Sequence, residues 1–262
     1  MITSSNRIDE RFRDLRESGR KALVCYATAG HPDRVRSLEL LQGLQDAGAD
    51  VIEVGVPFSD PLADGPVIQA SSQTAIDGGM TFEGALTLVE EAALQIPVVL
   101  FGYLNPFLAA GPDCLDRVAS AGCDGVLITD LPVGADPVLE RRFADSSLAF
   151  VRLVAPTTPP ERMRLIASKG SGFVYLISRL GVTGMQSEVS SDLGATVDRL
   201  RSATALPICV GFGVTDARQA ATVAGFADGV VVGSAIVKAA DASVASAVAL
   251  ARSLRAGIDD AA

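Results

Sequence analysis

The sequence predicts an α/β protein made of a single (β/α)₈ barrel of the TIM type, with one extra helix on the N-terminal side. Eight short apolar runs, each followed by a helical pattern, alternate along the 262 residues. No Pro/Ser-rich linker or low-complexity tract divides them, so we expect residues 1–262 to form one domain. The first strand-to-helix turn, Thr28-Ala-Gly-His-Pro-Asp33, also lacks the Gly-x-Gly-x-x-Gly pattern of an open doubly wound sheet.

The elements follow in chain order. An amphipathic pattern predicts the extra helix over about residues 8–18. Strands are predicted where apolar residues follow one another without alternating polar positions, because parallel strands are covered on both faces. They span residues 22–28, 51–55, 97–102, 125–129, 149–154, 173–177, 208–211 and 229–232. The clearest helices span residues 34–47, 81–94, 160–168, 193–202, 216–224 and 243–254, and others fill the remaining gaps.

Charge and hydrophobicity limit the possible partners. The chain has 31 acidic and 22 basic residues, a formal net charge of -9, which disfavours nucleic acid and anionic membranes. No apolar run approaches the roughly twenty residues of a membrane helix, and the first residues are too polar to resemble a secretory signal. We therefore expect a soluble, cytoplasmic protein.

Three residue types exclude common kinds of site. The cysteines form no Cys-x-x-Cys pair and are typical of small buried residues in a reducing compartment. The single histidine, His31, disfavours zinc sites and Ser-His-Asp triads, so we expect no metal ion. The lysines Lys21, Lys169 and Lys238 lie away from the predicted strand ends, which disfavours a Schiff-base mechanism. The carboxyl groups of aspartate and glutamate are therefore the remaining candidates for proton transfer.

Two carboxyl groups near the second strand are candidates for such an acid–base pair. Glu53 lies inside an apolar strand, where burial raises the pKa of a carboxyl group unless it is paired. Asp64 lies beside Gly65 on a Pro/Gly-containing loop and should stay closer to its ordinary acidity. Unlike environments of this kind separate acid from base roles. The alternative, a structural glutamate and a turn-forming aspartate, is equally compatible with the residues alone.

Glycines after the last three strands predict a phosphate site. Such residues allow backbone N–H groups to approach an oxyanion, and the start of a helix adds a favourable dipole. The loops after strands 7 and 8 commonly hold phosphate in barrels of this class. Taken singly, each glycine is better explained as a turn residue or a helix cap. The glycines belong to residues 181–184, 211–213 and 233–234, with Ser234 opening a short helix.

The loop after the sixth strand, about residues 178–191, is long enough to predict a lid. Gly181 and Gly184 could act as hinges, with Arg179 or Thr183 reaching back to the acidic loop. A connection without any function is the alternative.

The three tyrosines are predicted to present their hydroxyls to a pocket at the barrel mouth, although buried tyrosines also occur for packing alone. They are Tyr26, Tyr103 and Tyr175.

Four stretches together resemble the tryptophan synthase alpha chain family, in order and in spacing, over nearly the whole chain. The resemblance implies a (β/α)₈ barrel that cleaves indole-3-glycerol phosphate to indole and glyceraldehyde 3-phosphate without a cofactor. It also implies a partner, the pyridoxal-phosphate-dependent beta chain, in an α₂β₂ complex. The stretches are Glu53-Val-Gly-Val-Pro-Phe-Ser-Asp-Pro-Leu-Ala-Asp-Gly-Pro-Val-Ile-Gln69, Tyr175-Leu-Ile-Ser-Arg-Leu-Gly-Val-Thr-Gly184, Gly211-Phe-Gly213 and Gly233-Ser-Ala-Ile-Val-Lys238.

The resemblance assigns roles to residues that match the family's motifs. Glu53 would protonate C3 of the indole and then take the glycerol hydroxyl proton, while Asp64 stabilises positive charge at the ring N–H. Asp60 would lie at the docking face for the beta chain. The other matches are Tyr175 at the active site, Gly184, Gly213, Gly233 and Ser234 at the phosphate, Tyr26 and Phe212 beside the indole, and Thr183 in the lid.

Departures from the family pattern occur in loops at or near the docking face. His31 stands where the family usually has aspartate, residues 132–135 replace a segment that commonly ends in two glutamates, and Phe101-Gly102 is unusual. One hypothesis is a stand-alone lyase that releases indole, and ordinary drift is the other. A non-catalytic activating partner of a beta chain, or a different phosphate-sugar enzyme such as an epimerase, are alternatives from other classes.

Overall fold

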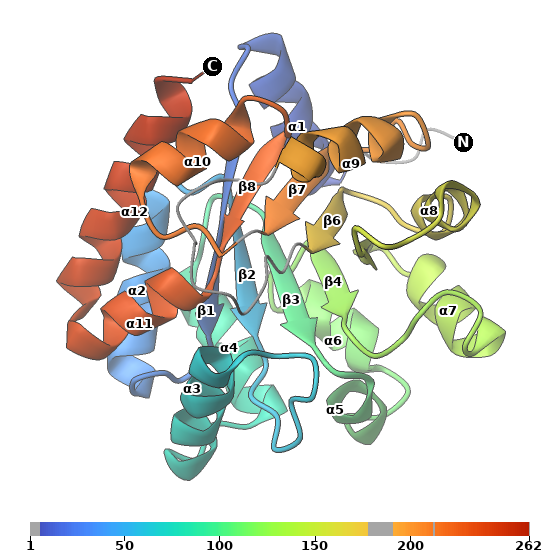
Figure 1. Cartoon of the computed structure of the whole chain (residues 1–262). Coiled ribbons are helices and arrows are strands. Elements are labelled where there is room, and N and C mark those ends of the chain that lie inside the picture. Colours follow the sequence, from blue (N-terminus) through green and yellow to red (C-terminus); the bar gives the residue numbers. More distant parts are fainter. Residues whose placement is uncertain (1–5, 178–190, 212, 262) are drawn as a thin grey trace.

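The computed structural model describes residues 6–177, 191–211 and 213–261. Eight parallel strands form a closed barrel in which each strand pairs with the next and β8 pairs with β1 (Figure 1). The predicted barrel is therefore confirmed. The strands are β1 (Ala22–Thr28), β2 (Val51–Gly55), β3 (Val98–Gly102), β4 (Gly125–Ile128), β5 (Ala149–Val154), β6 (Val174–Ile177), β7 (Ile208–Gly211) and β8 (Gly229–Val232).

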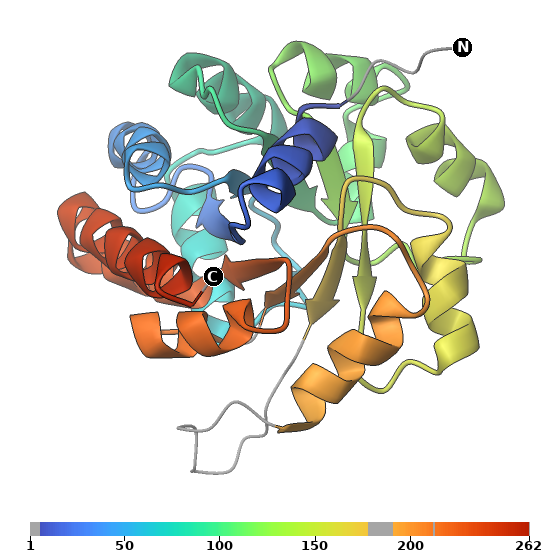
Figure 2. The same ribbon diagram turned by 90° about the horizontal axis from the view of Figure 1, so that it is seen from above.

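Helices cover the outside of the barrel (Figures 1 and 2). The predicted extra helix is α1 (Arg7–Glu17), which precedes β1. The remaining helices of the described part are α2 (Arg34–Asp46), α3 (Pro66–Asp77), α4 (Phe82–Ala92), α5 (Leu104–Ala109), α6 (Cys114–Ser120), α7 (Pro137–Ala144), α8 (Pro160–Ala167), α9 (Ser191–Arg201), α10 (Ala217–Ala224), α11 (Ser234–Ala242) and α12 (Val244–Asp259).

The predicted strands agree with the structure to within one residue at each end, whereas some helices were less clear. Helices α5 and α6 are too short to show a helical period, and α3 and α7 both begin at a proline. Helix α12 continues to Asp259, five residues past its predicted end. Gly257 is typical of a helix end, but here it allows α12 to pack on α10, because a side chain would collide with the backbone of Ala217.

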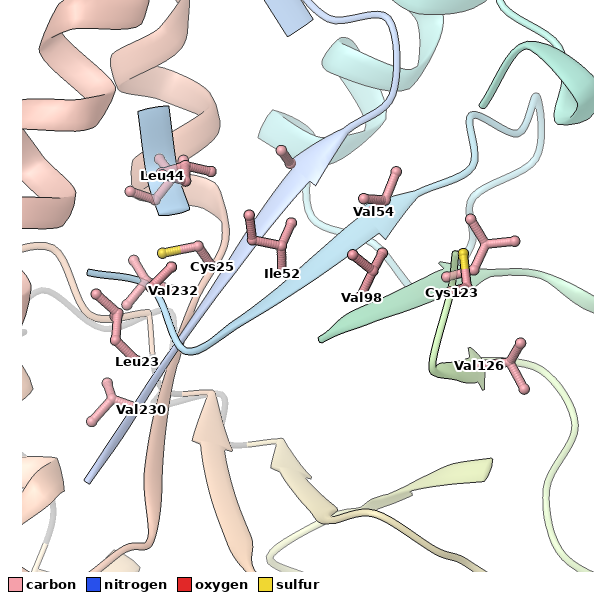
Figure 3. Packing of buried hydrophobic residues seen from close by; sticks show 14 of the residues in the cluster. Leu23, Cys25, Leu44, Ile52, Val54, Val98, Cys123, Val126, Val230 and Val232 are labelled. Atoms are coloured by element: carbon pink, nitrogen blue, oxygen red, sulfur yellow. The ribbon is translucent and has the colours of Figure 1, made fainter. Parts of the chain in front are cut away.

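The larger part of the hydrophobic core lies between the barrel and its helices. Outward-facing side chains of β1 and β2, among them Leu23, Cys25, Ile52 and Val54, gather with Leu44 of α2 (Figure 3). Because side chains alternate along a strand, the residues between them face the barrel interior. On β2 these inward residues include Val51 and Glu53.

A second core fills the barrel interior and is closed at the amino-terminal end by α1. Ile8, Phe12 and Leu15 of that helix pack against the inward residues Val51 and Phe173. The opposite end, where the strands finish and the βα loops begin, is the end at which an active site is expected.

A fully buried carboxylate at the closed end joins α1, β1 and α12. Asp50 accepts hydrogen bonds from the backbone N–H of Leu23 (2.7 Å), from Arg11 (2.5 Å) and from Arg255 (2.8 Å). These three donors, two of which belong to positively charged arginine side chains, compensate the cost of burying the negative charge of Asp50. Asp50 therefore belongs to the framework, at the opposite end of the barrel from the strands' carboxyl termini.

Candidate active site

A cavity of about 860 Å³, counting the space that opens to solvent, lies at the carboxyl ends of the strands. Its walls come from β1, β2, β3, β6, β7 and β8 and from the loops that follow β2, β7 and β8. The fold thus brings together residues that are far apart in the sequence. The predicted site residues that line this cavity are Tyr26, Glu53, Asp64, Tyr175, Gly213, Gly233 and Ser234.

Glu53 lies at the inner end of the cavity, on the inward face of β2. Its side chain is 1% exposed, and its Oε1 atom has no hydrogen-bond partner among the described residues. Burial without compensation raises the pKa of this carboxyl group from its usual 4.5 to about 8. At neutral pH Glu53 is therefore mostly protonated and can donate a proton to a bound molecule.

Asp64 lies on the loop between β2 and α3, and β3 holds its carboxylate in place. The hydroxyl of Tyr103, at the end of β3, donates a 2.9 Å hydrogen bond to Oδ2 of Asp64. The same hydroxyl accepts a 3.0 Å hydrogen bond from the backbone N–H of Ala63. Tyr103 is absent from the described lining of the cavity. Its hydroxyl therefore contacts the loop that carries Asp64 rather than the cavity itself. Burial, and then the charge of Asp64, raises the pKa of the Tyr103 hydroxyl, which therefore stays a donor.

Two tyrosines each occupy space left by a glycine on the following strand. The Tyr26 hydroxyl lies where a side chain at Gly55 would be, and the Tyr175 hydroxyl lies where a side chain at Gly211 would be. Burial is the main cause that raises the pKa of both hydroxyls, so they remain neutral. The two rings line the cavity near Glu53 and make this part of the cavity wall apolar.

Phe101 is a lining residue that the sequence analysis noted only as a departure. Its ring lies 5.3 Å from that of Tyr26, edge to face at 79°. In the register of the sheet, Gly55 pairs with Thr28 of β1 on one side and with Phe101 of β3 on the other. The missing side chain at Gly55 therefore lets the two rings meet. Alternation from the inward Val99 is the signal that could have identified Phe101.

The part of the cavity lined by the loops after β7 and β8 has the features of an anion site. Gly213 adopts a left-handed φ of 71°, and Gly233 precedes the first residue of α11, Ser234. Helix α11 begins without a side-chain cap, so its first N–H groups and its dipole remain available to an anion. No lysine or arginine appears in the described lining of the cavity, so backbone donors would bind the anion.

Several predicted residues are not part of the described lining of the cavity. The predicted lid residues Arg179 and Thr183, and the predicted ligand residues Gly184 and Phe212, are outside the described residues. Asp60 is exposed on the loop after β2, where its carboxylate accepts a 2.6 Å hydrogen bond from Ser59.

His31 is only 4% exposed, with Nε2 lying 2.9 Å from Oδ1 of Asp241 on α11. It therefore contacts α11, the helix that begins after Gly233, rather than solvent.

The described part of the chain lacks two further features. No helix there is both long and apolar enough to cross a membrane. No group of three or more His, Cys, Asp or Glu side chains within the same residues is placed to hold a metal ion.

Comparison with known proteins gives one consistent family. The model of the tryptophan synthase alpha chain family matches residues 12–258. The tryptophan synthase alpha chain of Caulobacter vibrioides is 45% identical over 239 residues, covering 89% of this chain and 86% of that protein. The corresponding chain of a Geobacter species is 46% identical over 236 residues, with coverage of 89% and 88%.

Solved structures agree. Tryptophan synthase subunit alpha from Legionella pneumophila superposes with a TM-score of 0.90 at 34% identity, covering 98% of this chain and all of that one. A chain of tryptophan synthase from Mycobacterium tuberculosis gives 0.88 at 34% identity, with coverage of 97% and 99%.

Proposed function

Because this chain belongs to the tryptophan synthase alpha chain family, we propose that Glu53 and Asp64 carry out the family's reaction, the cleavage of indole-3-glycerol phosphate to indole and glyceraldehyde 3-phosphate. The observation that carries this assignment is a single cavity whose lining includes both carboxyl groups and the start of α11, a helix N-terminus without a side-chain cap. Its size and its aromatic walls suit a flat bicyclic ring attached to a short phosphorylated chain.

Glu53 starts the reaction as a general acid. Its protonated carboxyl group gives a proton to C3 of the indole, which makes the ring an electron-accepting indoleninium. The raised pKa supports this role, because an ordinary glutamate would already be ionised at neutral pH. Asp64 accepts a hydrogen bond from the ring N–H and stabilises the positive charge that develops there. The hydrogen bond from Tyr103 keeps its carboxylate oriented.

The carbon–carbon bond then breaks. Glu53, now ionised, removes the proton from the hydroxyl group on the side-chain carbon attached to C3. The electrons of the O–H bond form the aldehyde carbonyl, and those of the C–C bond return to the indoleninium. Indole and glyceraldehyde 3-phosphate leave, and Glu53 is protonated again, so no water or cofactor is consumed.

The phosphate group fixes the substrate for these steps. Backbone N–H groups around Gly213 and Gly233 and the start of α11 at Ser234 would bind it. Binding energy from this remote group helps to orient C3 toward Glu53.

The family works with a tryptophan synthase beta chain, and we propose that this chain does so in an α₂β₂ complex in the cytoplasm. Asp60 is the candidate contact residue, since it lies on an exposed loop that also carries Asp64. The departure at His31 does not by itself favour a stand-alone enzyme, because a side chain only 5% exposed cannot meet a partner directly. Turnover measured with and without a cognate beta chain tests this point. Strong activation by the partner would exclude independence.

The reaction itself is tested by mixing the purified chain with indole-3-glycerol phosphate and measuring indole and glyceraldehyde 3-phosphate. Equal amounts of both products are expected. A non-catalytic activating subunit would release neither, and an epimerase would convert phosphorylated sugars without forming indole. Either outcome would contradict the proposed activity.

A further inference from the structure

The loop that carries Asp64 contains a tight turn with little apolar support. Asp64 donates its backbone N–H to the carbonyl of Pro61 at 3.0 Å, which closes the turn. Leu62, at the tip of the turn, is 92% exposed, so hydrophobic packing of its side chain does not hold the backbone there. Hydrogen bonds must supply most of the order of this segment, which is defined here as the acid turn, residues 61–64.

Gln69, in the first turn of α3, hydrogen-bonds to both ends of the acid turn. Its side-chain amide nitrogen donates to the carbonyl of Asp64 at 2.9 Å and to the carbonyl of Pro61 at 3.3 Å. One NH₂ group has two hydrogens, which is the number that these two acceptors need. The side chain thus joins the acid turn to the helix that follows it.

Helix α3 is itself fixed to the barrel. The hydroxyl of Ser71 lies 2.7 Å from that of Thr28 on β1, and both residues are buried. Ile68 is 8% exposed and belongs to the apolar cluster that includes Tyr26. Gln69 therefore connects the acid turn to a rigid element rather than to another loop.

From this geometry we infer that Gln69 is a positioning residue, which fixes the backbone of Asp64 while Tyr103 fixes its carboxylate. The catalytic consequence rests on the role proposed for Asp64. A misplaced carboxylate binds the ring nitrogen less well in the transition state, and small displacements of this kind reduce turnover strongly. We expect a larger effect on kcat than on substrate affinity, because Gln69 contacts the backbone of Asp64 and is absent from the described lining of the cavity.

Two substitutions separate the hydrogen bonds from the shape of the side chain. Gln69→Met keeps the length but has no donor, and Gln69→Glu keeps the shape but places negative charge against two carbonyl oxygens. Gln73 is the matched control, because it lies one turn further along the exposed face of α3 and, among the residues that the structure describes, its amide bonds only to Asp77, at 2.7 Å. Gln73→Met and Gln73→Glu remove that bond without touching the acid turn.

Hydrogen–deuterium exchange tests the structural part without any reference to activity. In Gln69→Met and Gln69→Glu, the backbone amides of residues 62–65 should exchange faster than in the wild type, whereas both Gln73 variants should match the wild type. Equal exchange in the Gln69 and Gln73 variants would overturn the inference.

Steady-state kinetics test the positioning role. The Gln69 variants should lose about tenfold in kcat with KM changed by less than about threefold, whereas the Gln73 variants keep both constants. Faster exchange with unchanged kcat would refute positioning. A wild-type protein that forms no indole would refute the proposed function instead, and the exchange comparison would then decide the inference alone.

Discussion

Tyr103 donates its hydroxyl hydrogen to Asp64 at 2.9 Å, so a residue at the end of β3 orients the acid carried by the loop after β2. Replacing Tyr103 by Phe removes this bond and the one accepted from Ala63, while the ring can keep its contact with Phe58 at 5.1 Å. We expect kcat for indole formation to fall about tenfold with an intact fold. Turnover within about twofold of the wild type would contradict the role given to this hydrogen bond.

Burial of Glu53 makes stability depend on pH. In the unfolded chain this carboxyl ionises near 4.5, but in the folded chain it keeps its proton up to about pH 8. Between these two pH values the folded state binds more protons than the unfolded state. The contribution of Glu53 to the free energy of unfolding therefore falls as pH rises, by about 1.4 kcal/mol per pH unit. The loss begins near the unfolded pKa and is complete above the folded one.

Glu53→Gln removes this titration. The difference in free energy of unfolding between the variant and the wild type should grow in favour of the variant from about pH 5 to pH 8 and then stay constant. Urea unfolding at several pH values measures it, and the subtraction cancels the other titrating groups. A difference independent of pH would show that Glu53 is not held protonated.

Gly211 leaves the space that the Tyr175 hydroxyl occupies. Gly211→Ala should displace that tyrosine, lower stability by about 1–3 kcal/mol through overpacking, and reduce indole formation. Gly194→Ala is the control, since Gly194 lies in helix α9 with no described atom within 4 Å of an added Cβ. It should be neutral or slightly stabilising. Equal thermal stability of the two variants would disprove the steric argument.

Ser234 opens α11 at the proposed phosphate end of the cavity. Ser234→Asp should repel a phosphate and raise KM by about tenfold or more with a smaller effect on kcat. Stability should hold or increase, because a carboxylate at a helix N-terminus is favourable. Kinetic measurements check the predicted rise in KM, and thermal unfolding checks that stability is unchanged or increased. An unchanged KM would place the phosphate elsewhere.

The barrel could be predicted from the sequence because parallel strands covered on both faces appear as runs without alternating polar positions, as in residues 51–56, where Glu53 is the single polar residue. Glu53 stood out for the same reason, as a charge within such a run. The start of α3 was not predicted, because Gly65 provides no side-chain cap and Pro66 resembles a turn. The contacts of Tyr103 and Gln69 with the acid turn depend on the path of a loop, which no periodicity encodes.

Indole formation from indole-3-glycerol phosphate by the wild type, Glu53→Gln and Asp64→Asn, each checked for native secondary structure, tests the central claim most directly. The wild type should release equal amounts of indole and glyceraldehyde 3-phosphate. Each variant should lose at least about a hundredfold in rate, since general acid–base steps and charge stabilisation contribute on that scale. A folded Glu53→Gln or Asp64→Asn protein that cleaves the substrate at nearly the wild-type rate would contradict the assignment of this acid pair.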